Sequence, residues 1–250
     1  MKFRAIIPAR YASVRFPGKP LARLGGKTVI QRVYERTAEV FADVYVATDD
    51  ARIEDAVKAF GGNVVMTSSN HKSGTERCYE ACLKTGEGDV VVNVQGDEPF
   101  VQPSQLEELM RCFQVSSTQI ATLVTPFSGR EGFETLANIN APKVVLDKDM
   151  NALYFSRSVI PFQRNAEQSS WLENHIYYKH VGLYAYRLDV LKEIVCLPFS
   201  ALEKAESLEQ LRWLENGYKI RAGITSVETI GIDTPEDLER AECFLKQNHS

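Results

Sequence analysis

The chain has 250 residues, enough for one large or two small domains with a substantial hydrophobic core. Its residues are 44% hydrophobic and 25% charged, as in ordinary globular proteins, and a formal net charge of −4 offers no basic field for general nucleic-acid binding.

No apolar run approaches the roughly 20 residues of a membrane-spanning helix. The first residues lead directly into a predicted strand, without the apolar segment of a signal peptide. The five cysteines are scattered and form no CxxC pair, which disfavours a disulfide framework or a zinc site. We therefore expect a cytoplasmic protein with reduced thiols that binds neither nucleic acid nor membrane.

The first half of the chain alternates between short apolar runs and amphipathic helical patterns. These patterns predict strands at residues 3–9, 43–49, 63–68 and 89–95, and helices at residues 27–41, 51–60, 73–86 and 103–113. Strands that alternate with helices of this length are typical of a parallel sheet covered on both faces. The fold class predicted is therefore α/β, with a mostly parallel twisted sheet.

The second half is less regular. Strands are predicted at residues 119–127, 143–147, 152–156, 179–187, 218–224 and 226–232, a polar loop at 163–175, and helices at 202–217 and 234–247. No repeat or linker separates these segments. We expect an α/β domain formed by residues 1–126 and 219–250, interrupted by a smaller irregular portion at 127–218.

The loop after the first predicted strand carries three cations, Arg10, Arg15 and Lys19. Prolines, beginning with Pro8, stiffen this segment, and Gly18 permits close backbone approach. In an open α/β sheet, ligands bind beyond the carboxyl ends of the strands, where this loop lies. Because Arg and Lys both recognise phosphate oxygens, the loop favours a triphosphate over a purely solvated role. The GxGxxG and GxxxxGK[ST] patterns of dehydrogenases and P-loop proteins do not occur in the sequence.

Two aspartates follow predicted strands and could reach the same edge of the sheet. Asp97 ends the stretch VVVNVQGD, where a metal ligand and an ordinary turn residue are equal alternatives. Pro235 suits the first position of the last helix, which makes Thr234 its N-cap and Asp237 the capping-box partner. Asp233 is then left without a structural role, so that Asp97 and Asp233 together predict a Mg²⁺ site beside the phosphates.

The stretch HKSGTER opens the third predicted helix. Ser73 and Glu76 fit a capping box, and the backbone donors of a helix N-terminus suit an anion. Arg77 lies in the first turn, where a cation is unfavourable for the helix dipole. That placement indicates a contact with a base or phosphate, although a plain capped surface helix is an equal alternative.

Several stretches together carry a resemblance to a known family. IPARYASVRFPGKPL, HKSGTER, VNVQGDEP, YFSRSVIPF, KHVGLYAYR, LEQLR and GIDTPEDL occur in order over nearly the whole chain, which resembles the CMP-Kdo synthetases, or 3-deoxy-manno-octulosonate cytidylyltransferases. The resemblance implies a nucleotide-binding α/β domain with a smaller portion for sugar-acid binding and dimerisation. It also implies a transferase that converts CTP and 3-deoxy-D-manno-octulosonate (Kdo) to CMP-Kdo and pyrophosphate for lipopolysaccharide biosynthesis.

The same resemblance implies roles for individual residues. Mg²⁺ would be held by Asp97 and Asp233, and the groups acting in catalysis would be these two with Arg10, Arg15 and Lys19. The nucleotide would be bound by Pro8, Arg10, Ser13, Lys19, Ser73, Arg77 and Gln95. The sugar acid would be bound by Arg15, Gln95, Arg157, His180, Glu209 and Gln210.

For the sugar-acid group the residues themselves leave alternatives open. A lone histidine such as His180 more often makes a structural hydrogen bond, and Glu209 and Gln210 lie off the apolar stripe of their predicted helix, which favours contact with water. A related enzyme, CMP-sialate synthetase, usually has a Gly-Gly-Ser-Lys-Gly run in the opening loop, whereas this chain has Tyr11-Ala12-Ser13-Val14-Arg15. A catalytically inactive nucleotide-binding regulator should lack a metal carboxylate or a loop cation, and all of them are present.

Overall fold

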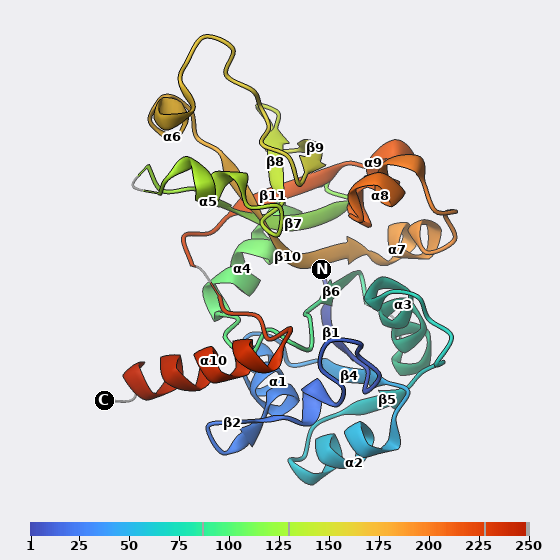
Figure 1. The fold of residues 1–250 in the computed structure, drawn as a ribbon. Coiled ribbons are helices and arrows are strands. Elements are labelled where there is room, and N and C mark those ends of the chain that lie inside the picture. Colours follow the sequence, from blue (N-terminus) through green and yellow to red (C-terminus); the bar gives the residue numbers. More distant parts are fainter. Residues whose placement is uncertain (87, 130, 228, 249–250) are drawn as a thin grey trace. The chain divides into compact units, whose positions relative to one another are not determined.

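The computed structural model describes residues 1–86, 88–129, 131–227 and 229–248 (Figure 1). It divides into two compact units. The first comprises Met1–Glu107, Tyr186–Val195 and Glu228–Ser250, and the second Glu108–Ala185 and Cys196–Val227. The functional division expected from the sequence, 1–126 with 219–250 against 127–218, stays a prediction.

The first unit is built on a parallel sheet in the order β6-β1-β4-β5. Its strands are β1 (Phe3–Ala9), β4 (Val44–Thr48), β5 (Val64–Met66) and β6 (Val90–Asn93). The connecting helices are α1 (Val29–Ala38), α2 (Ala51–Ala59) and α3 (Gly74–Thr85). Right-handed crossovers place α1 and α2 on one face and α3, whose connection runs back across the sheet, on the other. The predicted α/β class with a mostly parallel sheet is thus confirmed.

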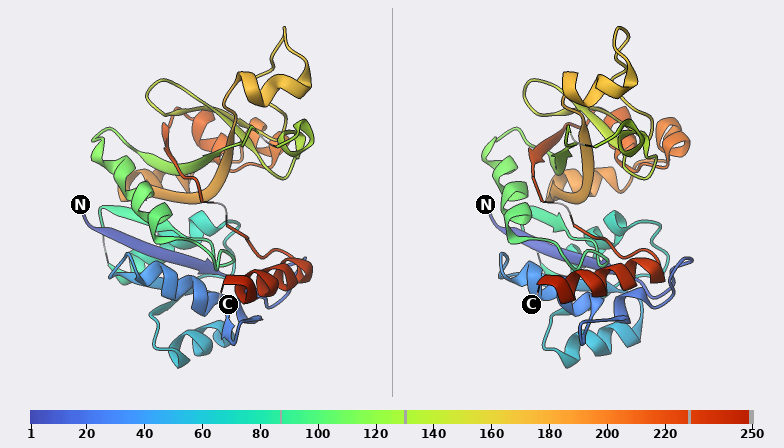
Figure 2. Two further views of the ribbon diagram at one scale, coloured as in Figure 1. Left: turned by 90° about the vertical axis from the view of Figure 1, so that its left-hand side faces the viewer. Right: turned by 60° about the vertical axis from the view of Figure 1, so that its left-hand side comes forward.

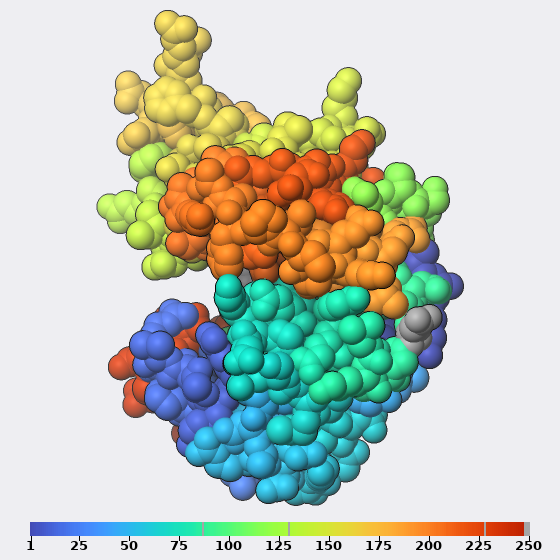
Figure 3. Space-filling view, turned by 90° about the vertical axis from the view of Figure 1, so that its right-hand side faces the viewer, coloured from blue at the N-terminus to red at the C-terminus, as the bar shows by residue number. Residues whose placement is uncertain are grey.

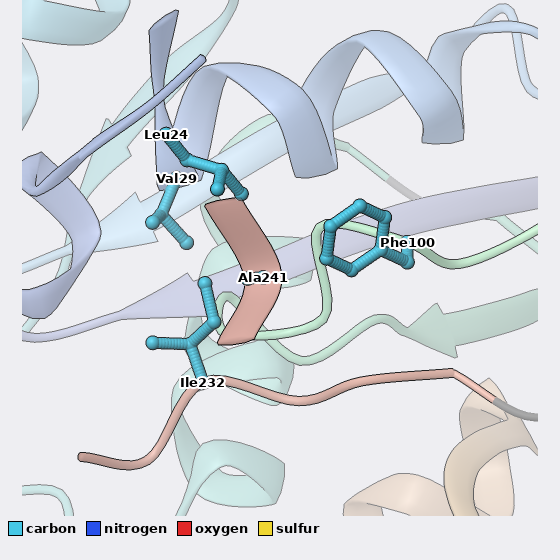
Figure 4. Packing of buried hydrophobic residues seen from close by; sticks show 5 residues of the cluster. All are labelled: Leu24, Val29, Phe100, Ile232 and Ala241. Atoms are coloured by element: carbon cyan, nitrogen blue, oxygen red, sulfur yellow. The ribbon is translucent and has the colours of Figure 1, made fainter. Parts of the chain in front are cut away.

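Further elements complete this unit around the sheet. They are the short ribbon of β2 (Arg23–Leu24) and β3 (Lys27–Thr28), the start of α4 (Pro103–Arg111), α7 (Leu188–Ile194) and the C-terminal α10 (Pro235–Asn248). The views in Figures 1 and 2 agree that α10 lies beside the β2 segment. A buried apolar cluster joins these parts: Leu24, Val29, Phe100, Ile232 and Ala241 (Figure 4). Packing of this cluster anchors the segment that enters α10.

The second unit contains the remaining strands. Strand β7 (Ile120–Pro126) lies between β11 (Ile220–Ile224), which is parallel to it, and β10 (Tyr178–Arg187). The strands β8 (Lys143–Leu146) and β9 (Ala152–Ser156) form an antiparallel pair, and β8 also pairs with β10. Short helices cover parts of this unit: α5 (Phe133–Ala137), α6 (Trp171–Asn174), α8 (Ala201–Glu206) and α9 (Gln210–Glu215).

Three local predictions in the irregular half were wrong. The helix expected at 202–217 is two helices, because Ser207 adopts a left-handed conformation with φ 52° and ends α8. The loop at 163–175 contains the short helix α6. The described part of 226–232 forms no strand, because its backbone instead bonds to the turn after β6, with Ile232 N donating to Asp97 O at 2.9 Å. Across the described ranges, no helix combines the length and apolar character needed to cross a membrane.

Candidate functional site

A pocket lies at the carboxyl edge of the first unit's sheet. Four segments line it: the loop after β1, the start of α3, the turn after β6 and the residue before the N-cap of α10. Because β1 and β6 are parallel neighbours, their carboxyl ends open on the same edge. The space-filling view shows the blue N-terminal segment and the teal segment of α3 reaching the surface next to each other (Figure 3).

The loop after β1 is closed by its own backbone. The carbonyl oxygen of Tyr11 accepts hydrogen bonds from Ser13 N at 3.0 Å and Gly18 N at 2.9 Å. Gly18 has φ +72°, and a Cβ there would stand 3.0 Å from the Tyr11 ring, so the position favours glycine. The Arg52 guanidinium covers the Tyr11 ring at 3.3 Å from its centroid. The loop therefore presents its cations from a defined backbone.

A charged cluster stands at one end of the pocket. The Lys19 ammonium bonds to Asp97 Oδ2 at 2.6 Å and to Asp233 Oδ1 at 3.2 Å, and Arg15 Nη2 lies 3.1 Å from Asp233 Oδ2. The Lys19 side chain is only 12% exposed, whereas that of Arg15 is 66% exposed. Lys19 is thus held in place between the carboxylates, while Arg15 reaches into solvent. The two aspartates that the sequence predicted to converge lie around one ammonium group.

Asp233 is placed by the start of α10. Thr234 Oγ1 accepts from Asp237 N at 3.3 Å, and Asp237 Oδ2 accepts from Thr234 N at 2.9 Å, which confirms the predicted capping box. Asp237 also accepts from Asp233 N at 3.0 Å. The backbone of Asp233 is therefore fixed by the helix terminus, and its carboxylate is left for the pocket.

Glu98 is a charged residue of this region that the sequence reasoning did not single out, although it stands in the GDEP stretch. Its carboxylate is partly buried and accepts from Thr229 Oγ1 at 3.1 Å. Burial, and then the negative charge of Asp97, raise the pKa of Glu98 to about 7. Glu98 thus bonds the segment before α10 to the turn that carries Asp97.

The start of α3 combines a confirmed cap with a missed histidine. Ser73 Oγ accepts from Glu76 N at 3.3 Å, as predicted for the N-cap. His71 also lines the pocket, and its Nε2 pairs with Glu80. Burial opposes the charge of Glu80, but hydrogen bonds from Lys84, Ser68 N and His71 together lower its pKa to about 2.

Arg77 is buried, so the reading of this helix as a plain surface helix is wrong for that residue. It is 4% exposed and lines the pocket. Its Nη1 donates to Thr67 Oγ1 at 2.7 Å, and its Nη2 lies 3.2 Å from Asp49 Oδ1. The unfavourable position in the first turn is thereby offset by an acceptor and a carboxylate at the ends of neighbouring strands.

Pro8 and Gln95 form another part of the pocket wall, together with glycines. A Cβ on Gly74 would lie 3.2 Å from Pro8 Cγ and 3.8 Å from Gln95 Oε1, so the three residues are neighbours. A Cβ on Gly96 would lie only 2.7 Å from Pro8 O, which requires glycine for this close approach. Arg10 and Ser13 line the same pocket. Every residue predicted to bind the nucleotide therefore lies in its wall.

The remaining predicted residues belong to the second unit. His180 Nε2 lies 3.1 Å from Thr122 Oγ1, and its ring packs 5.2 Å from that of Phe155 and 5.3 Å from that of Tyr184. Burial lowers the pKa of His180 to about 4. The ring is therefore neutral at physiological pH and hydrogen-bonded inside the protein, which agrees with a structural role.

Glu209 and Gln210 differ in their surroundings. Glu209 precedes α9. Burial of Tyr184 raises the pKa of its hydroxyl, and the negative charge of Glu209 raises that pKa further. Gln210 is only 4% exposed, so the expectation that it faces water was wrong. The break at Ser207 changes the direction of the chain, and the apolar stripe assumed for one continuous helix no longer applies. Within the described ranges, Gln210 Nε2 has no hydrogen-bond partner.

Arg157 already makes several protein contacts. Its guanidinium donates to the carbonyl oxygens of Glu206 at 2.7 Å, Ile139 at 2.9 Å and Ser207 at 3.3 Å. A guanidinium has five N–H donors. Two donors therefore remain for a ligand.

The donor set of the charged cluster limits the kind of metal that it could hold. Over the described residues, no group of three or more His, Cys, Asp or Glu side chains is arranged to bind a metal ion. The carboxylates of Asp97 and Asp233 suit Mg²⁺, which takes one or two protein carboxylates together with phosphate oxygens and water.

Comparison with known proteins bears on this site. A family model described as cytidylyltransferase matches residues 4–220. A Bacteroides thetaiotaomicron protein named 3-deoxy-manno-octulosonate cytidylyltransferase is 71% identical over 98% of this chain and 99% of its own length. A Geobacter sulfurreducens protein of the same name is 47% identical over 98% of this chain and all (100%) of its own length.

Solved structures extend the comparison. A structure of CMP:2-keto-3-deoxy-manno-octonic acid synthetase complexed with CTP is 45% identical, with a TM-score of 0.91 over 99% of this chain and 100% of that one. A 4-diphosphocytidyl-2C-methyl-D-erythritol synthase from Anaerococcus prevotii is 14% identical, with a TM-score of 0.61 over 98% of this chain and 99% of that one. This second likeness concerns the fold alone.

Proposed function

The chain belongs to the cytidylyltransferase family, and on that premise we propose that it transfers the cytidylyl group of CTP to Kdo. The products are CMP-Kdo and pyrophosphate. The observation that carries the proposal is the cluster of Lys19, Asp97 and Asp233 beside the closed loop after β1, in a chain 71% identical to a named Kdo cytidylyltransferase. The cluster combines cations for phosphates with carboxylates for a divalent ion.

The loop after β1 holds the triphosphate in this proposal. Arg10, Ser13 and Lys19 supply donors for phosphate oxygens, and the Tyr11 carbonyl keeps the loop closed around them. Fixed donors stabilise the charge that develops in the transition state without having to reorganise. Asp97 and Asp233 would hold Mg²⁺, which when bound supplies positive charge to the phosphate oxygens.

In the reaction, the anomeric hydroxyl of Kdo attacks the α-phosphorus of CTP. A bond forms between that oxygen and phosphorus, and the hydroxyl proton is released to water. The bond from phosphorus to the oxygen that bridges to the β-phosphate breaks, and pyrophosphate leaves with that oxygen and its electron pair. Arg15, whose side chain reaches into solvent from the loop, is the cation proposed at the reaction centre. Holding both substrates in place removes much of the entropic barrier, and the proposal needs no covalent enzyme intermediate.

The second unit would supply the sugar-acid contacts. Arg157 offers its two remaining donors to the Kdo carboxylate, Glu209 can accept from sugar hydroxyls, and Gln210 has an amide without a partner in the described structure. His180, neutral and bonded to Thr122, would support this group through its ring. Gln95 would contribute from the nucleotide pocket.

The wider setting is part of the same proposal. We expect a cytoplasmic homodimer whose product enters lipopolysaccharide biosynthesis, with CTP and Kdo as its small-molecule partners. The dimer would form through the second unit, where large apolar side chains are exposed, among them Leu153, Phe162 and Ile176.

The experiment that tests the activity measures pyrophosphate release with CTP, Mg²⁺ and Kdo. Sialic acid in place of Kdo and UTP in place of CTP run in parallel. Release confined to CTP and Kdo would support the proposal. Release with sialic acid instead of Kdo would indicate a different sugar-acid specificity. If folded protein binds CTP but releases no pyrophosphate with any substrate pair, a catalytically inactive nucleotide-binding regulator would be favoured.

The variant Asp97→Asn sharpens this experiment. It should abolish turnover while leaving the melting temperature near that of the parent protein, because the carboxylate faces the pocket rather than the core. Removing one group that stabilises transition-state charge costs about 2.7–4 kcal/mol in other enzymes. Mg²⁺-dependent release close to the parent rate would refute the role of Asp97 as a ligand.

A further inference from the structure

The pocket wall of the first unit contains a buried arginine with more donors than partners. Arg77 is 4% exposed, and only its contacts with Thr67 and Asp49 occupy the guanidinium within the described structure. A guanidinium carries five N–H donors and cannot accept a hydrogen bond. Because burying polar groups without partners is costly, and Arg77 lines the pocket, the remaining donors are suited to a bound ligand.

The strand register holds this guanidinium in place. Thr48 at the end of β4 pairs with Met66 at the end of β5, so the residues that follow, Asp49 and Thr67, stand next to each other at the carboxyl edge. The Thr67 hydroxyl donates to Thr48 O at 3.2 Å and accepts from Arg77, which fixes its direction. The guanidinium is thus fastened at two neighbouring strand ends.

Asp49 is dedicated to this contact. Its Oδ1 is buried and makes no hydrogen bond with the described residues, yet it lies 3.2 Å from Arg77 Nη2. The next residue, Asp50, has a different task, because its Oδ1 accepts from Arg52 N at 3.0 Å and caps α2. Two adjacent aspartates therefore separate into one that faces the pocket arginine and one that starts a helix.

The charges of the pocket indicate which part of a nucleotide reaches Arg77. Lys19, Asp97 and Asp233 form the end suited to phosphates and a divalent ion. Arg77 lies one helical turn beyond Ser73 on α3, on the wall with Gly74, which adjoins Pro8. The base of a nucleotide whose phosphates occupy the charged end is the part left for this wall.

Cytosine and uracil differ at the edge that a guanidinium can read. Cytosine presents N3 and O2 as adjacent acceptors, whereas uracil presents an N3–H donor beside O2. We propose that Asp49 and Thr67 are positioning residues that aim Arg77 at the N3 and O2 acceptors of cytosine and thereby set the preference for CTP over UTP. This inference rests on the proposed function only in requiring that a nucleotide enter this pocket.

A fixed orientation is what gives such a donor its selectivity. A site built to hydrogen-bond one partner rejects an analogue strongly, because its buried polar group is then left unpaired. A guanidinium free to rotate could retreat from the uracil N3–H and bond to O2 alone. Loosening Arg77 should therefore weaken CTP binding more than UTP binding, while a general loss of structure would weaken both alike.

The test compares CTP and UTP affinities of the full-length protein by calorimetry, with UTP displacing CTP where its direct signal is weak. The variants are Asp49→Asn and Thr67→Val, and the matched control is Asp50→Asn, since asparagine also caps helices well. We expect the ratio of UTP to CTP dissociation constants to fall about tenfold in both variants, the effect of losing one hydrogen bond to a charged group. The ratio should be unchanged in the control.

The outcomes separate this inference from the proposed function. Unchanged ratios in folded Asp49→Asn and Thr67→Val would overturn it, even if the parent protein makes CMP-Kdo. If the ratio of UTP to CTP dissociation constants falls in Asp49→Asn but not in Thr67→Val, the positioning role is also overturned, because Asp49 would then contact the base itself. A fall in both variants would support it even if pyrophosphate release with Kdo failed. If Asp49→Asn does not fold, the ratio in Thr67→Val decides.

Discussion

The Lys19 ammonium bonds to the carboxylates of both Asp97 and Asp233, so substituting Lys19 should affect nucleotide binding. In Lys19→Ala, the ammonium between Asp97 and Asp233 is lost, and the carboxylates repel each other and the phosphates. We expect CTP affinity to fall about tenfold to a hundredfold, the range for hydrogen bonds to charged groups. Calorimetry measures this directly. Lys27→Ala removes a cation of a half-exposed ion pair and should leave affinity unchanged; equal affinities in both variants would refute the phosphate contact.

His180 makes stability depend on pH. Its pKa falls from 6.5 to about 4 because burial disfavours the charged ring. As the pH drops below 6.5, the unfolded chain therefore takes up a proton before the folded protein does. The stabilisation that depends on a neutral His180 is therefore fully present above pH 6.5, and it is lost progressively as the pH falls to about 4.

Urea unfolding at pH 7 and pH 5 measures that loss. Between pH 7 and pH 5, the free energy of unfolding of His180→Gln should fall by about 2 kcal/mol less than that of the parent protein. This follows from about 1.4 kcal/mol for each unit of pKa difference between the folded and unfolded states. His175→Gln, at an exposed position, should keep the parent's dependence. The same acid sensitivity in His180→Gln and the parent would contradict the assignment.

The site could be predicted from the sequence only where a residue's chain position decides its place. Asp97 follows β6, which ends at the sheet's carboxyl edge, so its place was foreseeable. The strand predicted before Asp233 does not form, and Asp233 is brought to Asp97 instead by the start of α10 and by the hydrogen bond from Ile232 N to Asp97 O. The partners of Arg77 could not be predicted, because Asp49 and Thr67 lie next to each other only through the register between β4 and β5. Residue types alone do not give that register.

At the level of elements, α8 and α9 show where periodicity fails. The apolar spacing continues through Leu208, so the sequence predicts a single helix. The turn at Ser207 depends on a left-handed backbone that the spacing does not reveal. The alternating first half was easier, because each strand and helix there has a complete apolar pattern of its own and ends at a recognisable turn.

An ion pair joins these two helices across their break. Glu203 of α8 accepts from Arg212 of α9 at 2.8 and 2.6 Å, and both residues are buried. Glu203→Gln should lower the free energy of unfolding by about 3 kcal/mol, because a buried guanidinium loses the nearer and more buried of its two carboxylates and keeps only Glu209, at 3.6 Å. Denaturant unfolding measures the change. Glu39→Gln, in an exposed pair with Arg36, should cost under about 1 kcal/mol, and a similar small loss in Glu203→Gln would contradict the prediction.

At the scale of the whole molecule, the second unit exposes large apolar side chains. Leu153, Phe162 and Ile176 are 60%, 72% and 61% exposed. Such surfaces favour association, so we expect a dimer by light scattering at micromolar concentration. Leu153→Asp should shift the mass toward that of the monomer, whereas Leu83→Asp, at a similarly exposed position on α3, should not. A monomeric mass for the parent protein would count against the proposed dimer.

The pairing of Lys19 with Asp233 spans 214 positions of the chain. During synthesis, the cation-rich loop leaves the ribosome long before its second carboxylate. A product cut short ahead of Ile232 would carry Arg10, Arg15 and Lys19 against Asp97 alone, and would lack the buried anchor that Ile232 supplies. Such a fragment would lack the paired carboxylates that contact Lys19. The paired site is therefore completed only after Asp233 has been synthesised, 214 positions after Lys19.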